Sequence, residues 1–150
     1  MKKTRIATIE DSAQLSALFD QYRVWYHKES DLEGAKQFLS ERLQKNQSEI
    51  FVAEHDGELV GFTQLYPLFS STRMKTYWLL NDLYVNENYR GKGFSKALIE
   101  EAKQLCRSNK ACGVLLETDK TNDIGNQLHP RTDFELNTHS NFYEWTNPEA

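Results

Sequence analysis

Residues 85–96 read Val-Asn-Glu-Asn-Tyr-Arg-Gly-Lys-Gly-Phe-Ser-Lys and lie between an apolar strand pattern and an amphipathic helix pattern. Gly91 and Gly93 allow a sharp backbone turn and a close approach to a ligand. The amides that open the following helix have no partners within it, and together with the helix dipole they favour a phosphate anion. A turn of this kind can also do no more than join a strand to a helix. The stretch therefore predicts a strand, a turn and a helix that can cradle a pyrophosphate.

Two common phosphate-binding motifs do not fit this stretch. A Walker loop requires Gly-x-x-x-x-Gly-Lys-Ser/Thr, and the sequence holds no such string. A dinucleotide-binding turn follows a first strand, whereas this turn comes late in the chain and has Lys96 in place of the third glycine. The stretch is therefore neither a Walker loop nor a typical dinucleotide-binding turn.

The spacing resembles motif A of the GNAT family of N-acetyltransferases, Arg/Gln-x-x-Gly-x-Gly/Ala, which is matched by Arg90 and Gly93. Ser95 departs from the motif, because glycine or alanine is usual there. The resemblance implies acetyl-CoA as the cofactor. It also implies a set of residues that bind the cofactor's pyrophosphate: Arg90, Gly91, Lys92, Gly93, Phe94, Ser95 and Lys96.

The length and composition suggest one domain over residues 1–150, since 150 residues with 39% hydrophobic content can bury one core. A formal net charge of −4 argues against nucleic acid as a partner. Five basic residues nevertheless gather near the turn and suit a small polyanion: Arg90, Lys92, Lys96, Lys103 and Arg107.

Neither a signal peptide nor a membrane-spanning run is apparent in the sequence, so we expect a cytoplasmic protein with no membrane partner. Cys106 and Cys112 are too few for a disulfide framework and are expected to be reduced packing residues. The four histidines are scattered and do not form a paired ligand pattern, so no metal is expected.

Hydrophobic periodicity predicts an α/β (α+β) fold with a mixed central sheet of six to seven strands and about four helices. Asp11 and Gln14 suggest a capping box for the first helix, the second helix is expected after the Glu33-Gly34 break, and Pro67 is expected to end a strand. The expected strands are 3–9, 50–55, 58–65, 77–85, 113–117, 134–136 and 142–145. Asp56-Gly57 predicts a type I′ hairpin, and a short helix is expected at 124–128. A helix between strands 77–85 and 113–117 implies that they pair in parallel.

This order of elements is similar to that of the GNAT fold, so the resemblance covers essentially the whole chain. In that family the strand before the glycine turn binds pantetheine and the thioester carbonyl through backbone amides. The corresponding residues here are Leu83, Tyr84 and Val85. A fixed N–H that stabilises negative charge on the carbonyl oxygen contributes about 3 kcal/mol. Leu83 and Val85 can serve as core residues at the same time.

A second family motif is matched in part by Asn122, Leu128 and Phe134. The resemblance implies that Asn122 bonds the pantetheine arm. His129 stands where the family often has a tyrosine that protonates the departing thiolate, and it is either that acid or a capping or surface histidine. Pro130 biases the residue before it away from the helical region. Asp133 replaces a glycine and can adopt the left-handed conformation that a helix end requires.

Attack on a thioester requires a neutral amine, so a base or a water relay is expected. Asp82 is the candidate base, although its side chain alternates with Leu83 and can face away from the carbonyl site. Asn81 lacks the carboxylate that polyamine acetyltransferases of the family often carry there. Trp25, Tyr26 and Glu29 are candidates for an acceptor pocket that binds a cationic amine. Alternatively, Trp25 and Tyr26 close the core while the charged residues beside them are solvated.

The favoured function is an acetyl-CoA-dependent N-acetyltransferase, an acyltransferase that moves acetyl to a primary amine of a small molecule or peptide by direct attack. One alternative is an acyl-CoA-binding protein of the same fold with little catalysis, because the segment around His129 is altered. Another is a dimerising interaction module, a homodimer whose edge carries Phe142, Tyr143 and Trp145.

Overall fold

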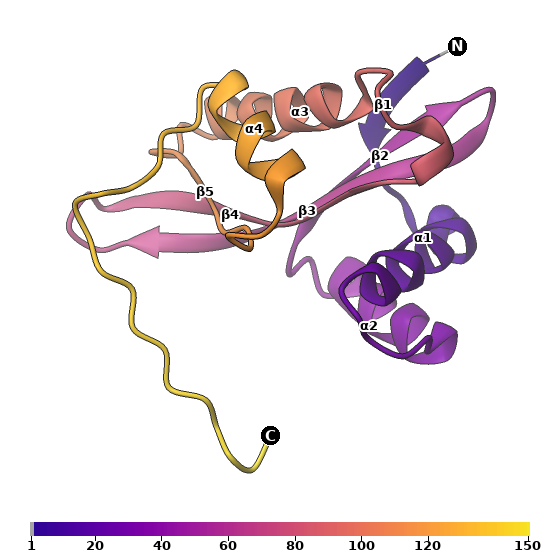
Figure 1. Ribbon diagram of the computed structural model, residues 1–150, viewed down its shortest axis with the longest axis horizontal. Helices are drawn as coiled ribbons and strands as arrows, with labels where there is room; N and C mark the ends of the chain where they lie inside the picture. The colour runs from indigo at the N-terminus through magenta and orange to yellow at the C-terminus, as the bar shows by residue number, and fades with distance from the viewer. Residues whose placement is uncertain (1) are drawn as a thin grey trace. The chain divides into compact units, whose positions relative to one another are not determined.

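The computed structural model describes residues 2–150, which divide into two compact units, one ending at Glu117 and the other running from Thr118 to Ala150 (Figure 1). The single domain expected over residues 1–150 stays a prediction. Within residues 2–150, no helix combines the length and the apolar composition needed to cross a membrane.

The first unit is built on a five-stranded sheet in the order β1-β2-β3-β4-β5. Its strands are β1 (Lys2–Ile6), β2 (Glu49–His55), β3 (Glu58–Ser70), β4 (Lys75–Val85) and β5 (Val114–Leu116). The first four strands pair antiparallel, whereas β5 is parallel to β4. The parallel pairing across the connecting helix is confirmed.

Helices lie on both faces of this sheet (Figure 1). On one face, α1 (Ser12–Trp25) and α2 (Leu32–Gln44) bury apolar side chains such as Leu15 and Leu39 in a core shared with β2, β3 and β4. On the other face lies α3 (Phe94–Ser108), whose buried residues are Phe94, Leu98, Ile99 and Ala102. Their spacing of three and four residues is that of one helix face, as the sequence predicted.

The first helix starts after Asp11 as predicted, but the predicted capping box of Asp11 with Gln14 and the predicted start of the second helix were wrong. The Asp11 carboxylate accepts the N–H of Thr8 (2.8 Å), whereas the Gln14 side chain accepts the N–H of Leu59 (3.1 Å) and so fixes α1 to β3. In α2, Asp31 accepts the N–H of Gly34 (2.9 Å). Gly34 therefore belongs to the first turn of this helix and does not precede it.

The hairpin between β2 and β3 has the predicted turn, with positive φ at both Asp56 (51°) and Gly57 (83°), as type I′ requires. The predicted end of β3 at Pro67 was wrong, because Pro67 pairs with Trp78 and the strand continues to Ser70. The first residue of β2, Glu49, pairs with Leu65, so beyond Leu65 the described sheet gives β3 no partner on the β2 side. Proline, which has no N–H to donate, is tolerated at such an unpaired edge.

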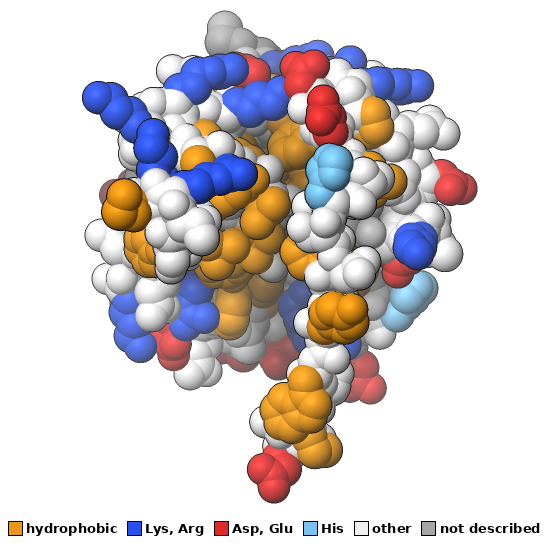
Figure 2. All heavy atoms as spheres, turned by 90° about the vertical axis from the view of Figure 1, so that its left-hand side faces the viewer, with side chains coloured by type: hydrophobic (Ala, Val, Ile, Leu, Met, Phe, Trp, Pro, Cys, Tyr) orange, Lys and Arg blue, Asp and Glu red, His pale blue; other side chains and the backbone are white. Residues whose placement is uncertain are grey.

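The second unit contains α4 (Asp123–Arg131), which extends past the predicted end and includes Pro130. Residues 133–150 form neither helix nor strand, so the strands predicted at 134–136 and 142–145 were wrong. Instead, the Asn137 side chain accepts the N–H groups of His139 (2.9 Å) and Ser140 (3.2 Å) in a local turn. Large hydrophobic side chains toward the end of this C-terminal segment are exposed (Figure 2), namely Leu136, Phe142, Tyr143 and Trp145. The described sheet therefore has five strands where six to seven were expected.

Candidate functional site

The chain leaves β4 through the 3₁₀ helix Glu87–Tyr89 and a glycine turn, and then enters α3. Gly91 and Gly93 have φ of 75° and 90°, in the left-handed region. A Cβ atom added at Gly91 would meet nothing within 4 Å, so the space over the turn is open. Among residues 2–150, no side chain caps the N-terminus of α3. The segment thus offers unoccupied backbone donors and an open surface, which is the form a phosphate ligand requires.

Two lysines approach this turn from different parts of the first unit. The Lys2 ammonium donates to the carbonyl of Lys92 and lies 5.6 Å from the centre of the Phe94 ring. The Lys92 ammonium lies 5.2 Å from the centre of the Tyr89 ring. Positive charge therefore surrounds the loop from β1 as well as from the loop itself, and the contribution of Lys2 was missed in the sequence.

Arg90 has a structural position that the sequence did not indicate. Its Nε donates to the carbonyl of Val85 (2.9 Å), and its guanidinium lies 5.7 Å from the Trp25 ring and 5.6 Å from the Tyr84 ring. The side chain thus joins the end of α1 to the end of β4. Trp25 and Tyr26 remain 44% and 40% exposed, so they do not close the core.

The end of β4 has one edge without a strand partner. Pairing with β5 involves Trp78 to Leu80, and beyond Leu80 the described sheet gives β4 no partner on that side. On the β3 side, Leu65 pairs with Leu80 and Gln64 pairs with Asp82, so Asn81 is an extra residue in β4. This is a β-bulge, a feature that is common beside active sites.

Backbone directions at this edge distinguish the three residues expected to bind the cofactor. The N–H of Asn86 donates to Val60 in β3 (2.8 Å), and the Tyr84 carbonyl points toward Gly61 of β3. Because successive residues in a strand direct their backbone groups to alternate sides, those of Leu83 and Val85 point away from β3. Leu83 and Val85 therefore present the amides at the unpaired edge, whereas Tyr84 pairs with β3.

The Asp82 carboxyl group is 5% exposed and lies on the α1 and α2 face of the sheet, as does Tyr84. It accepts hydrogen bonds from Gln64 Nε2 (2.8 Å) and Asn81 Nδ2 (3.1 Å). Burial raises the pKa of Asp82, and these hydrogen bonds oppose that shift in part. A carboxylate with a raised pKa is a better proton acceptor than an exposed aspartate.

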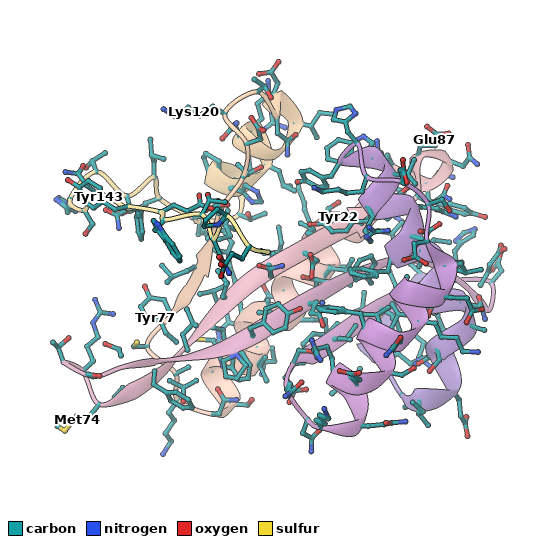
Figure 3. The ribbon with its side chains drawn as sticks, turned by 90° about the horizontal axis from the view of Figure 1, so that it is seen from below. Tyr22, Met74, Tyr77, Glu87, Lys120 and Tyr143 are labelled. Carbon is teal, nitrogen blue, oxygen red and sulfur yellow. The ribbon has the colours of Figure 1, made fainter. Side chains whose placement is uncertain are left out.

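Tyrosines border this carboxylate. Tyr22 of α1 faces the sheet (Figure 3), where its ring lies 5.7 Å from that of Phe62. Burial and the Asp82 charge raise the pKa of Tyr22, and they raise the pKa of Tyr66 to about 12. Both hydroxyl groups therefore stay protonated at neutral pH. Tyr22, Tyr66 and Gln64 were not predicted as site residues, because nothing in the sequence reveals which residues lie beside Asp82.

The second unit holds two residues of the predicted site, Asn122 and His129. Asn122 caps α4, since its Oδ1 accepts the N–H of Gly125 (3.1 Å) and its Nδ2 donates to Thr118 Oγ1 (2.9 Å). His129 lies in α4 with its ring 5.9 Å from that of Phe134, and its buried Nδ1 has no hydrogen-bond partner among residues 2–150. Burial lowers the pKa of His129. Asp133 has φ of 69°, as predicted for the end of this helix.

Metal binding receives no support from the part of the chain that the structure describes, since residues 2–150 include no group of three or more His, Cys, Asp or Glu side chains that could hold a metal ion.

Comparison with known proteins gives consistent matches. A sequence model described as the Acetyltransferase (GNAT) family matches residues 13–134. The uncharacterized N-acetyltransferase YhfO of Bacillus subtilis (strain 168) is 42% identical over 134 residues, covering 89% of this chain and 90% of that protein.

Solved structures agree with these matches. The crystal structure of a probable acetyltransferase is 34% identical, covers 97% of each chain and has a TM-score of 0.90. An aminoglycoside acetyltransferase from an uncultured soil metagenomic sample, solved with trehalose, is 21% identical with a TM-score of 0.82, covers 97% of this chain and 96% of its own, and shares the fold.

Proposed function

Because this chain belongs to the GNAT family of acetyltransferases, we propose that it is an acetyl-CoA-dependent N-acetyltransferase that acts by direct attack of a primary amine. The acceptor is a small molecule or a peptide. The alternation of backbone and side-chain directions in β4 is the observation that supports this proposal most.

At the end of β4, backbone N–H donors for a thioester carbonyl and a carboxylate base for an amine lie within four residues, Asp82 to Val85. The Leu83 and Val85 amides point to the unpaired edge, and the Asp82 carboxylate points to the α1 and α2 face. Acetyl-CoA would supply an activated acetyl group at this edge. Each fixed N–H that bonds the acetyl carbonyl oxygen would stabilise developing charge by about 3 kcal/mol.

The glycine turn would hold the cofactor's pyrophosphate. Gly91 and Gly93 leave the backbone accessible, and the N-terminus of the 15-residue helix α3 adds its dipole. Lys92 and Lys96 contribute positive charge, and Lys2 adds to it from β1. Only the short 3₁₀ helix Glu87–Tyr89 separates the turn from β4, so binding at the turn would orient the pantetheine arm along the unpaired edge.

Asp82 would remove a proton from the amine, directly or through a water molecule. An alkylammonium has a pKa of about 10.4, so it needs a base before it can attack. The rings of Tyr22 and Tyr66 flank the carboxylate, and aromatic faces with a buried negative charge suit a cationic acceptor. Trp25, Tyr26 and Glu29 would border the entry for the acceptor. His129 remains our candidate for the proton donor to the departing thiolate.

The test is an acetylation assay over a panel of amines that includes polyamines, aminoglycosides, amino-acid amides and peptides with free N-termini. Thiol release measures turnover, and mass spectrometry identifies the acetylated product. We expect at least one product to form, with strongly reduced turnover in Asp82→Asn and normal rates in Glu58→Gln, which changes an exposed carboxylate of β3. Tight binding of acetyl-CoA without any acetylation would instead favour an acyl-CoA-binding protein.

A further inference from the structure

Gln64 is a fully buried polar side chain in β3, directly opposite Asp82 in the strand register. Burial of an amide is costly unless its polar atoms form hydrogen bonds. Both ends of this amide are bonded: Nε2 donates to Asp82 Oδ2 (2.8 Å), and Oε1 accepts from Ser48 Oγ (2.8 Å). Two short hydrogen bonds therefore connect Ser48, the residue before β2, through Gln64 of β3 to Asp82 of β4.

The chemistry of these three groups lets the connection persist in either protonation state of Asp82. A carboxylate accepts hydrogen bonds and cannot donate, so the charged form faces the Nε2 group of Gln64. A protonated carboxyl group can donate to Oε1 after the amide rotates by a half-turn. Ser48 accommodates that rotation because a hydroxyl group both donates and accepts. The buried amide is therefore never left without a partner.

We propose that Gln64, supported by Ser48, is a positioning residue that fixes the orientation of the Asp82 carboxylate and stays bonded to it before and after proton uptake. The inference rests on the proposed function, in which Asp82 receives the proton of the amine. The same contact stabilises the charged form of Asp82 inside the core.

The other groups facing Asp82 come from each element packed around it. Tyr22 of α1 and Asn81 of β4 also favour the charged carboxylate through hydrogen bonds. Tyr66 of β3 lies close enough for the Asp82 charge to raise its pKa, and Arg42 of α2 acts on Tyr66 in the opposite sense. Both tyrosines stay neutral near pH 7. Amide and phenol donors thus offset the burial of the carboxylate, and Gln64 is the fully buried one of these donors.

The test replaces Gln64 by methionine, which has a similar volume and cannot donate. Loss of the donor should move the acid limb of the kcat/KM profile to higher pH by about one unit, which is about a tenfold loss of rate below the limb. The rate should recover at high pH. Ser48→Ala should shift the limb in the same direction by less, and it serves if Gln64→Met does not fold. Gln104→Met, on the exposed surface of α3, is the matched control.

A second measurement does not depend on catalysis. Carbon-13 NMR of labelled aspartate follows the Asp82 carboxyl group through its titration, and the signal is identified by its loss in Asp82→Asn. We expect the titration of Asp82 to move upward in Gln64→Met. A rate that falls equally at every pH, with an unchanged titration, would overturn the proposal. A titration that moves while the acid limb stays in place would leave Gln64 as the support of Asp82 and remove Asp82 as the base.

Discussion

Gly93 offers a sharp test of the glycine turn, because it is the residue before α3 and has φ of 90°. An alanine side chain in the left-handed region costs about 1–2 kcal/mol. In a surface loop the unliganded chain can relieve that strain by moving φ to negative values. Binding of CoA would then have to restore the turn, so Gly93→Ala should weaken CoA affinity by about 5–30-fold, the factor that 1–2 kcal/mol gives.

Gly57 supplies a matched control, since its φ of 83° is similar and an added Cβ atom is not crowded at either glycine. At Gly57 it would meet no described atom within 4 Å, and at Gly93 it would meet the Lys2 ammonium at 3.9 Å, an ordinary contact distance. Gly57 lies in the β2–β3 hairpin, where relief of strain would disrupt strand pairing. Gly57→Ala should therefore lower Tm by about 2–8 °C, at 2–4 °C for each kcal/mol, and leave CoA affinity unchanged.

The assay is calorimetric titration with CoA, together with thermal unfolding of each variant. The reasoning is refuted if Gly57→Ala loses stability as expected while Gly93→Ala binds CoA as tightly as the unaltered protein. That result would show that alanine strain is measurable in this chain and that the turn is not the phosphate site.

Further predictions concern the charged and titratable residues of the site. Lys96→Glu should weaken CoA binding at least tenfold without changing Tm. Arg90→Glu should weaken CoA binding and also lower Tm, because the Arg90 guanidinium packs between Trp25 and Tyr84. Equal Tm values for the two variants would contradict that packing role. Asp82→Asn should lower kcat by at least about 100-fold with CoA affinity unchanged, as measured by steady-state kinetics and titration. Burial raises the pKa of Asp82, so its ionisation destabilises the fold as pH rises above the ordinary aspartate pKa of about 3.9. Asp82→Asn should therefore be at least as stable as the unaltered protein at pH 7. Denaturant titrations should show that this stability advantage vanishes below about pH 4. Burial lowers the pKa of His129, so a charged imidazole donor is present mainly at acidic pH. The loss of kcat in His129→Phe should therefore be largest at acidic pH and shrink as pH rises. Equal kcat values for the variant and the unaltered protein at every pH would exclude His129 as the acid.

The features predicted correctly from the sequence are those that a few neighbouring residues determine. Glycine in the turn, Asp56-Gly57 in the hairpin and Asp133 after α4 all have the expected positive φ. Each of these conformations follows from local backbone sterics, which the residue type controls. The amphipathic α3 was likewise predicted from its own periodicity.

The wrong predictions concern features that depend on partners distant in sequence. A strand at 142–145 would need a neighbour to bond its backbone, and the residue pattern alone does not supply one. Pro67 could continue β3 because pairing with β2 stops at Leu65, and the strand register that decides this cannot be predicted from nearby residues. Gln64 was not predicted as part of the site for the same reason, since its importance comes from facing Asp82.

The bulge at Asn81 explains how one strand can serve both substrates. Gln64 and Leu65 are consecutive in β3 and so face opposite sides of the sheet, and their partners Asp82 and Leu80 must do the same. If the same residues ran as a regular strand without the bulge, strict alternation would place Asp82 on the same side as Leu80, away from Tyr22. The bulge therefore turns the carboxylate toward α1 and α2 just where pairing with β5 ends and the Leu83 and Val85 amides become available. Donor and acceptor can then approach the same few residues of β4 from different directions, which is the geometry that direct transfer requires.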